Sequence, residues 1–105
     1  MLDSPAICNY NKNVKIEFDP AKSSKNALER GLPFEWAVEF DWETAFYWED
    51  SRQTYPERRF VALGFLGERL HVLCFTPIEG GVRVISFRKA NTREVRRYEQ
   101  EIADR

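Results

Sequence analysis

The sequence predicts an α+β domain in which two N-terminal helices and one C-terminal helix lie beside a mostly antiparallel sheet. Three observations predict this class. One strand pattern near the N-terminus precedes two helical patterns, four more strand patterns follow one another through short connections, and a capped amphipathic helix pattern closes the chain. Strands joined by short turns pair antiparallel, so helices that flank such a run pack beside the sheet.

The first residues, 1–13, are polar, carry Pro5 and three asparagines, and show no periodicity, which is typical of a tail. The rest of the chain can form a packed core, because 43% of all residues are hydrophobic and 14% are aromatic. A length of 105 residues fits one domain. We therefore expect an N-terminal tail followed by a single domain over residues 14–105.

One strand and two helices are expected before residue 41. VKIEF (14–18) alternates apolar and charged positions, as a half-buried strand does. After it, Asp19 suits the N-cap of a helix, Pro20 its first position and Gly31 the residue just past its end. In PFEWAVEF (33–40) the apolar residues recur mostly at helical spacing, which predicts a second short helix.

Four strands are expected next. TAFYWED (44–50) is aromatic and β-branched enough for a strand, and SRQTYPE (51–57) has the composition of a loop. The stretch 58–88 divides at LGE and PIEGG into three strands of an antiparallel meander. Side chains of a regular strand alternate between its faces, so Arg83 and Arg88 are expected on opposite faces of the sheet.

The closing segment NTREVRRYEQEIADR predicts the last helix. Asn91 and Glu94 have the spacing of a capping box, in which each side chain bonds the backbone of the other. Val95, Tyr98 and Ile102 fall on one helical face, which is expected to pack on the sheet.

Charge is polarised along the chain although its total is nearly balanced. Sixteen basic and seventeen acidic residues give a formal net charge of −1, which excludes a strongly basic nucleic-acid-binding domain. Residues 35–50 nevertheless hold six acids and no base, whereas residues 83–98 hold six bases and one acid. The basic segment is either a site for an anionic ligand or the solvated face of an ordinary helix, and these residues alone favour neither.

Several kinds of site are not expected. Two cysteines are too few for a disulfide framework or a metal-ligand cluster, and GxGxxG and P-loop motifs are missing, so we expect neither cofactor nor metal. No apolar run is long enough to cross a bilayer, which predicts a cytoplasmic protein without membrane contact. The one histidine, His71, lies between Leu70 and Val72, where a sheet-face residue is commoner than a catalytic base.

Arginine and tyrosine in the basic segment are compatible with cleavage of RNA, although arginine equally suits pairing with carboxylates. Attack of a 2′-hydroxyl on the RNA backbone needs a base for that hydroxyl, donors for the phosphorane charge and an acid for the leaving oxygen. Arginine and tyrosine side chains can supply the last two, and a carboxylate or a lysine of lowered pKa can supply the first.

The chain resembles the BrnT family of toxins from bacterial type II toxin–antitoxin modules, from about Val14 to Tyr98. The resemblance is carried by the segments FDPAKSSKNALERG, LPFEWAVEFDW, ERRFVALG and RVISFRKANTREVRRYE. In the first three, the matching positions are Asp19, Lys22, Asn26, Gly31, Phe34, Ala37, Phe40, Glu57, Arg59 and Gly64. In the last they are Arg83, Ile85, Ser86, Arg88, Ala90, Glu94 and Tyr98.

This resemblance implies a RelE-like fold, a ribonuclease activity that blocks translation, and neutralisation by a BrnA-type ribbon-helix-helix antitoxin. It also implies that operator DNA is contacted only through the antitoxin. On this basis the catalytic candidates are Arg59, Arg83, Arg88 and Tyr98. The candidates for binding the RNA substrate are Lys22, Arg30, Lys89 and Arg93.

The expected function is therefore a metal-independent endoribonuclease toxin that cleaves RNA by 2′-hydroxyl attack. The alternative is a catalytically degenerate toxin that acts only as an antitoxin-binding module. Glu29 and Arg30 stand where the family usually has Lys-His. Arg30 is therefore a candidate only for donating hydrogen bonds to a phosphate. The general base stays open between Glu57 and Glu94, since either carboxylate can instead pair with an arginine.

Overall fold

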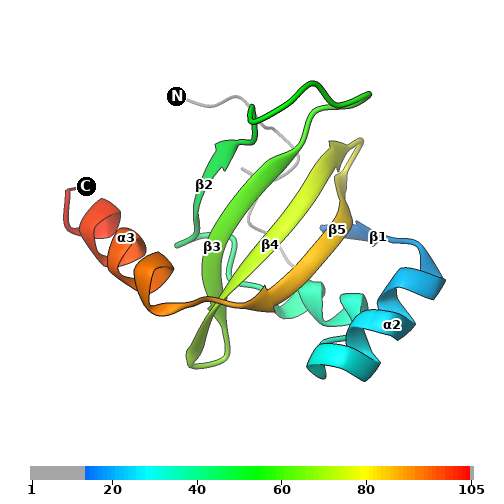
Figure 1. Cartoon of the computed structure of the whole chain (residues 1–105), viewed down its shortest axis with the longest axis horizontal. Helices are drawn as coiled ribbons and strands as arrows, with labels where there is room; N and C mark the ends of the chain where they lie inside the picture. The colour runs from blue at the N-terminus through cyan, green and yellow to red at the C-terminus, as the bar shows by residue number, and fades with distance from the viewer. Residues whose placement is uncertain (1–13, 105) are drawn as a thin grey trace.

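The structure is a computed structural model that describes residues 14–104, so the tail expected over residues 1–13 lies outside the described part. Its elements follow the predicted order (Figure 1). The helical segments are α2 (Pro20–Arg30), the 3-10 helix η1 (Phe34–Glu39) and α3 (Thr92–Ala103). The strands are β1 (Lys15–Glu17), β2 (Phe46–Glu49), β3 (Phe60–Leu66), β4 (Arg69–Ile78) and β5 (Gly81–Lys89).

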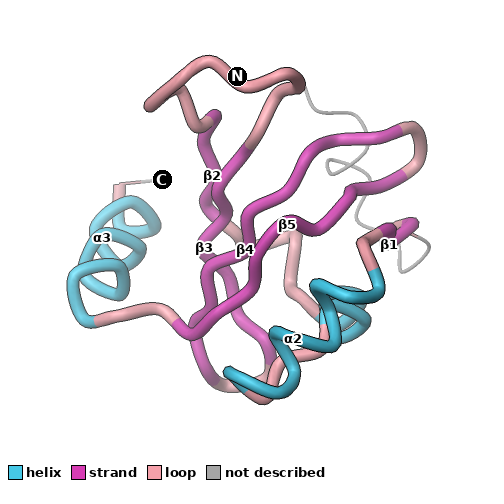
Figure 2. Tube along the Cα trace, turned by 45° about the vertical axis from the view of Figure 1, so that its right-hand side comes forward, coloured by secondary structure: helices cyan, strands magenta, loops and turns pink. Residues whose placement is uncertain are grey.

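The strands form one five-stranded sheet in the order β1-β5-β4-β3-β2. The pairs β2–β3, β3–β4 and β4–β5 are antiparallel, as expected for a meander, and β1 pairs parallel with β5. Figure 2 shows α2 and α3 on opposite sides of the strands. The predicted α+β class is thus confirmed. None of the described helices is both long and apolar enough to cross a membrane.

Local signals set the helix ends as predicted. The Asp19 carboxylate accepts a hydrogen bond of 2.8 Å from a backbone N–H in the first turn of α2, and Gly31 ends that helix with a φ of 69°. The segment 34–39 is helical as expected, but it is a 3-10 helix. Its last bond, from the Phe40 N–H to the Ala37 carbonyl, spans three residues.

Aromatic rings fill the core between the sheet and the layer made by α2 and η1. Phe60, Phe75 and Phe87 are fully buried and come from three neighbouring strands. Phe34 and Phe40 meet them from the η1 segment. Large rings bury much apolar area per residue, so this short chain gains most of its core from few side chains.

A second and smaller core lies on the other side of the sheet, under α3. Leu63, Leu70 and Val72 of β3 and β4 are buried there together with Tyr98 of α3. Val95, on the same helical face, packs against them. The predicted apolar face of the last helix is therefore the face that packs on the sheet.

The pairing of β4 with β5 shifts register once. Consecutive residues Cys74 and Phe75 of β4 pair with Ser86 and Val84 of β5. Ile85 is therefore an extra residue in β5, which makes a β-bulge. A bulge of this kind changes which side of the sheet every later side chain in the strand faces.

The bulge overturns one expectation from the sequence. Val84 and Phe87 are three residues apart, yet both are buried in the larger core. Arg83 and Arg88 consequently face the same side of the sheet, the side opposite that core. The expectation that they lie on opposite faces is wrong, because it assumed regular alternation along β5.

His71 is a buried sheet-face residue, as the sequence favours. It is 4% exposed, its Nδ1 lies 2.8 Å from the Arg69 carbonyl oxygen, and its ring centroid is 5.6 Å from that of Phe87. Burial lowers the pKa of this imidazole, and the neighbouring charges of Arg69 and Lys89 lower it further.

Replacing Gly64 by alanine is expected to destabilise the protein. A Cβ at this position would lie 2.5 Å from Cζ of Phe40 and 3.1 Å from Cβ of Ala45. Because Phe40 is buried, it cannot turn into solvent, and overpacking of this kind costs about 1–3 kcal/mol. Urea unfolding of Gly64→Ala should show this loss. The control is Gly67→Asn, which has a φ of 64° and open space around it. Equal losses in both variants would contradict the explanation.

The stability of the protein should depend on His71 between pH 7 and 5. The folded-state pKa lies below the ordinary value of about 6.5, so the unfolded chain binds a proton that the folded chain does not. This contribution is fully present above pH 6.5 and is lost as the pH falls toward the folded-state pKa. The free energy of unfolding should therefore fall more steeply over this range in the wild type than in His71→Gln. Parallel curves would show that another group dominates.

Candidate functional site

The side of the sheet opposite the larger core carries a row of polar side chains. Arg83, Ser86 and Arg88 of β5 all face this side and are half-buried. Cys74 and Thr76 of β4 pair with Ser86 and Arg83 and face the same way. Val72 pairs with Arg88, four residues before Thr76, so the two arginines start about 13 Å apart at about 3.3 Å per residue.

Arg83 is held by two carboxylates from distant parts of the chain. Its Nε donates to Glu17 of β1 at 3.1 Å, and its Nη1 donates to both carboxylate oxygens of Glu57 at 3.0 Å. The Arg83 side chain is still 41% exposed. These hydrogen bonds raise the pKa of Arg83, the bond to Glu17 most strongly. The guanidinium is thus pre-oriented and remains open to an incoming anion.

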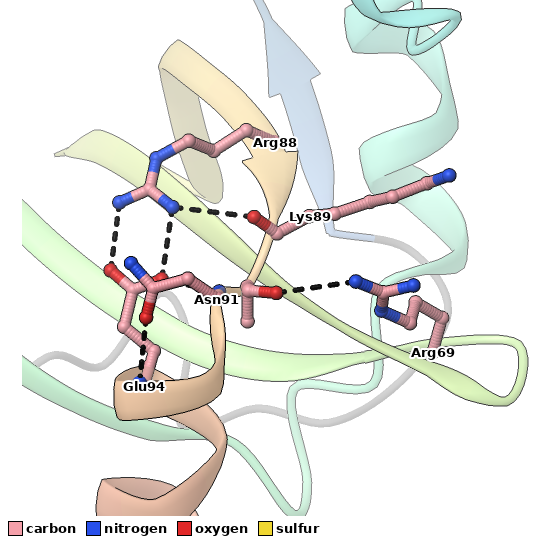
Figure 3. A network of polar contacts seen from close by, with 6 residues as sticks. Arg69, Arg88, Lys89, Asn91 and Glu94 are labelled. Atoms are coloured by element: carbon pink, nitrogen blue, oxygen red, sulfur yellow. Dashed lines mark hydrogen bonds and ion pairs between the residues drawn. The ribbon is translucent and has the colours of Figure 1, made fainter.

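Arg88 is paired with Glu94 across the junction of β5 and α3 (Figure 3). Two parallel bonds, of 2.9 Å and 2.7 Å, join its Nη1 and Nη2 to the two carboxylate oxygens. Glu94 also accepts a bond from the Asn91 N–H, while the Asn91 side chain accepts one from the Glu94 N–H. The predicted capping box is therefore confirmed. Hydrogen bonds from Arg88 lower the pKa of Glu94.

Other basic side chains lie near this junction. Lys89 and Arg93 are exposed. Arg93 lies in the first turn of α3, whereas Lys89, the last residue of β5, pairs with His71 and points to the side of the sheet opposite to Arg88 (Figure 3). Arg69 donates from Nη2 to the Ala90 carbonyl at 3.3 Å, as Figure 3 shows. Nothing in the sequence near Arg69 singled it out. Only the pairing of β4 with β5, which sets residue 70 beside residue 90, places it there.

Arg59 lies at the end of the loop that joins β2 to β3. Its guanidinium carbon is 4.4 Å from the ring centroid of Tyr55, and its Nε is buried without a hydrogen-bond partner among the described residues. Phe60, the next residue, pairs with Phe75, so Arg59 is level with Thr76. Thr76 of β4 also pairs with Arg83 of β5. Arg59 and Arg83 therefore flank Thr76, one on each neighbouring side of β4.

The same loop is organised by a buried carboxylate that sequence reasoning missed. Asp50 is 8% exposed and accepts bonds from the backbone and guanidinium of Arg52 and from the hydroxyl of Tyr55. The bonds from Arg52 hold the pKa of Asp50 far below its usual range. An aspartate that bonds the backbone two residues later is a turn signal, and this was the only available clue.

Three of the candidates lie elsewhere. Tyr98 is 7% exposed, its ring packs edge-on against Phe65, and its hydroxyl donates to the Thr44 carbonyl at 3.0 Å. This geometry favours a packing role for Tyr98 over proton transfer. Lys22 and Arg30 are exposed on α2, on the side of the sheet opposite to Arg83 and Arg88.

The assembled arrangement suits a polyanion more than a metal ion. Arginine forks match phosphate oxygens, and each of the two central arginines can exchange a carboxylate partner for a phosphate. The described residues contain no cluster of three or more His, Cys, Asp or Glu side chains placed to hold a metal.

Comparison with known proteins identifies the family. No curated protein sequence matches the chain. A family model described as "Ribonuclease toxin, BrnT, of type II toxin-antitoxin system" matches residues 18–94, which is most of the chain and includes both arginines and their carboxylate partners Glu57 and Glu94. The protein therefore belongs to the BrnT family of ribonuclease toxins of type II toxin–antitoxin systems, whose members act with an antitoxin partner.

Proposed function

We propose that the protein is a metal-independent endoribonuclease that cleaves RNA by 2′-hydroxyl attack and thereby inhibits translation. The observation that carries this proposal is the bulge at Ile85, which turns Arg83 and Arg88 toward the same half-exposed side of the sheet. Two arginines whose backbones are about 13 Å apart suit separate phosphates of one strand better than a single small anion. Membership of a ribonuclease toxin family supports RNA as the polyanion.

In the proposed mechanism Arg83 binds the phosphate that is cleaved and Arg88 binds another phosphate of the same strand. The 2′ oxygen attacks phosphorus and the bond to the 5′ oxygen breaks, which leaves a 2′,3′-cyclic phosphate and a 5′-hydroxyl. Arg83 stabilises the extra negative charge on the phosphorane oxygens. Solvent water protonates the leaving 5′ oxygen, since the Arg83 side chain lies on a surface that water reaches.

Glu57 is the better candidate for the general base. Its two carboxylate oxygens accept hydrogen bonds of 3.0 Å from the Arg83 guanidinium. A phosphate bound by Arg83 would therefore bring the 2′-hydroxyl close to the Glu57 carboxylate. Glu94 is less suited because its oxygens already bond Arg88 and the cap of α3, and these bonds lower its pKa. A carboxylate stabilised in its charged form is a weaker base.

We further propose that a cognate antitoxin of the BrnA type, with a ribbon-helix-helix part, neutralises the protein in the cytoplasm. Operator DNA would be contacted through that antitoxin. Arg59 and Arg93 are proposed to assist RNA binding, whereas Lys89, together with Arg69 at the edge of the same junction, would contact RNA that passes to the His71 side of the sheet. Lys22 and Arg30 would contact only RNA that extends around to the α2 side of the sheet.

Arg83→Ala and Arg88→Ala should each lower RNA cleavage measured in the presence of EDTA. A donor aimed at the developing charge is worth about a hundredfold to a thousandfold in rate, so Arg83→Ala should show a loss of that order and Arg88→Ala a smaller one. Arg96→Ala, on the exposed surface of α3, is the matched control. Undiminished cleavage by Arg83→Ala would remove it from the mechanism. No cleavage by any form, with antitoxin binding intact, would favour the degenerate-toxin alternative.

Glu57→Gln tests the role of Glu57 as general base, and Glu17→Gln is the matched control. Both carboxylates bind Arg83, but only Glu57 is proposed to accept a proton. Loss of a general base lowers the rate by about a hundredfold to ten-thousandfold. Glu57→Gln should therefore reduce kcat by this order, and Glu17→Gln should have a much smaller effect. Similar losses in the two variants would mean that both residues only orient Arg83.

A further inference from the structure

A hollow of about 510 Å³ lies at the loop between β2 and β3, beside the proposed cleavage site. Residues 50–51 and 53–59 of the loop form most of its wall, with Glu49 of β2 completing it. A second hollow, of about 370 Å³, is lined by Arg83 and Thr76. The two hollows share Glu57 and Arg58 as lining residues, so the loop hollow opens next to the guanidinium proposed to hold the cleaved phosphate.

The wall of the loop hollow contains a stacked pair of flat groups. The Arg59 guanidinium carbon lies 4.4 Å from the ring centroid of Tyr55, and both side chains are half-buried. The Tyr55 hydroxyl donates to Asp50 at 3.0 Å, which fixes the position of the ring. Aromatic rings and arginine planes are the surfaces on which unpaired bases of RNA stack.

The carboxylates of this hollow are paired with arginines, whereas one of its arginines has no such partner among the described residues. Each of three carboxylates is paired with an arginine: Asp50 with Arg52, Glu49 with Arg58 and Glu57 with Arg83. Arg59 has no carboxylate partner among the described residues, and its buried Nε has no acceptor there. Because Arg83 is also bound by Glu17, these carboxylates and arginines balance in number, and Arg59 is the guanidinium among them that is left available to a ligand.

We propose that the loop hollow is a nucleobase-binding subsite, which holds a base of the RNA next to the phosphate bound by Arg83. The base would stack on the pair formed by Tyr55 and Arg59, and the exposed side chains of Gln53 and Thr54 would contact its polar edge. This inference rests on the proposed function, because it takes RNA as the ligand. It adds a place where the protein discriminates among bases.

Binding of uncleavable RNA tests the subsite independently of catalysis. A short single-stranded 2′-O-methyl RNA cannot be cut by its own 2′ oxygen, and an abasic residue can be placed at each position in turn. For the wild type, fluorescence anisotropy should show one position at which loss of the base weakens binding by about fivefold to a hundredfold. Tyr55→Leu should abolish this difference, whereas Tyr55→Phe, which keeps the ring and loses the hydroxyl, should retain it.

Three results would overturn the inference. The first is equal wild-type affinity for the intact RNA and for every abasic form. The second is an undiminished base effect in Tyr55→Leu. The third is loss of the effect in Tyr55→Phe as well, which would assign the role to the bond with Asp50 and not to stacking. If Tyr55→Leu does not fold, Gln53→Leu decides, because it should change which of the four bases binds best and an unchanged order would refute the subsite.

Cleavage assays separate this inference from the proposed function. If the wild type binds in a base-dependent manner but does not cleave natural RNA in EDTA, the nuclease proposal fails and the subsite stands. If it cleaves but no base position affects binding, the subsite fails and the nuclease proposal stands.

Discussion

Between Cys74 and Phe75 the β4–β5 ladder shifts by one residue, and both sides of the sheet depend on that shift. It lets Val84 and Phe87, three residues apart, share the aromatic core under α2 and η1. The same shift turns Arg83 and Arg88 toward the opposite side. Without the extra residue, one arginine would have to enter the core or one core residue would have to face water, and either change would be costly. The arrangement of the proposed site thus follows from how the core is packed.

In the proposed site each of the two arginines is paired with carboxylates of the same chain. Arg83 is shared by Glu17 and Glu57, and Arg88 is gripped by Glu94. Partly exposed pairs like these are individually weak, so a phosphate can replace a carboxylate without a large penalty. The carboxylates also hold long flexible side chains in place before a ligand arrives, which lowers the entropy cost of binding.

The sequence predicts the elements well because their signals are local. The caps at Asp19 and Asn91, the glycine at residue 31 and the alternating strands each act within a few residues. The bulge is set by packing against β4, so regular alternation misplaced Arg88 relative to Arg83. The sign of the bulge in the sequence is that two apolar residues that are both buried, Val84 and Phe87, are three positions apart. The bonds of Asp50 to Arg52 and Tyr55 are local, but many surface turns carry an aspartate, so the sequence alone did not show that this one is buried. The family resemblance found the arginines together with Glu57 and Glu94, but which arginine each carboxylate binds, and the part of Glu17, come from the structure.

The parallel strand β1 has a consequence for the order in which the protein is assembled. Glu17 and Arg83 are 66 residues apart in the chain, and among the strands β1 pairs with β5, while its Ile16 packs against the larger core. Contacts of such long separation close large loops and form late in folding. During synthesis, which proceeds from the N-terminus, β1 must wait for β5 before it has a partner. The proposed site, in which Glu17 of β1 holds Arg83 of β5, is therefore complete only after β5 has left the ribosome.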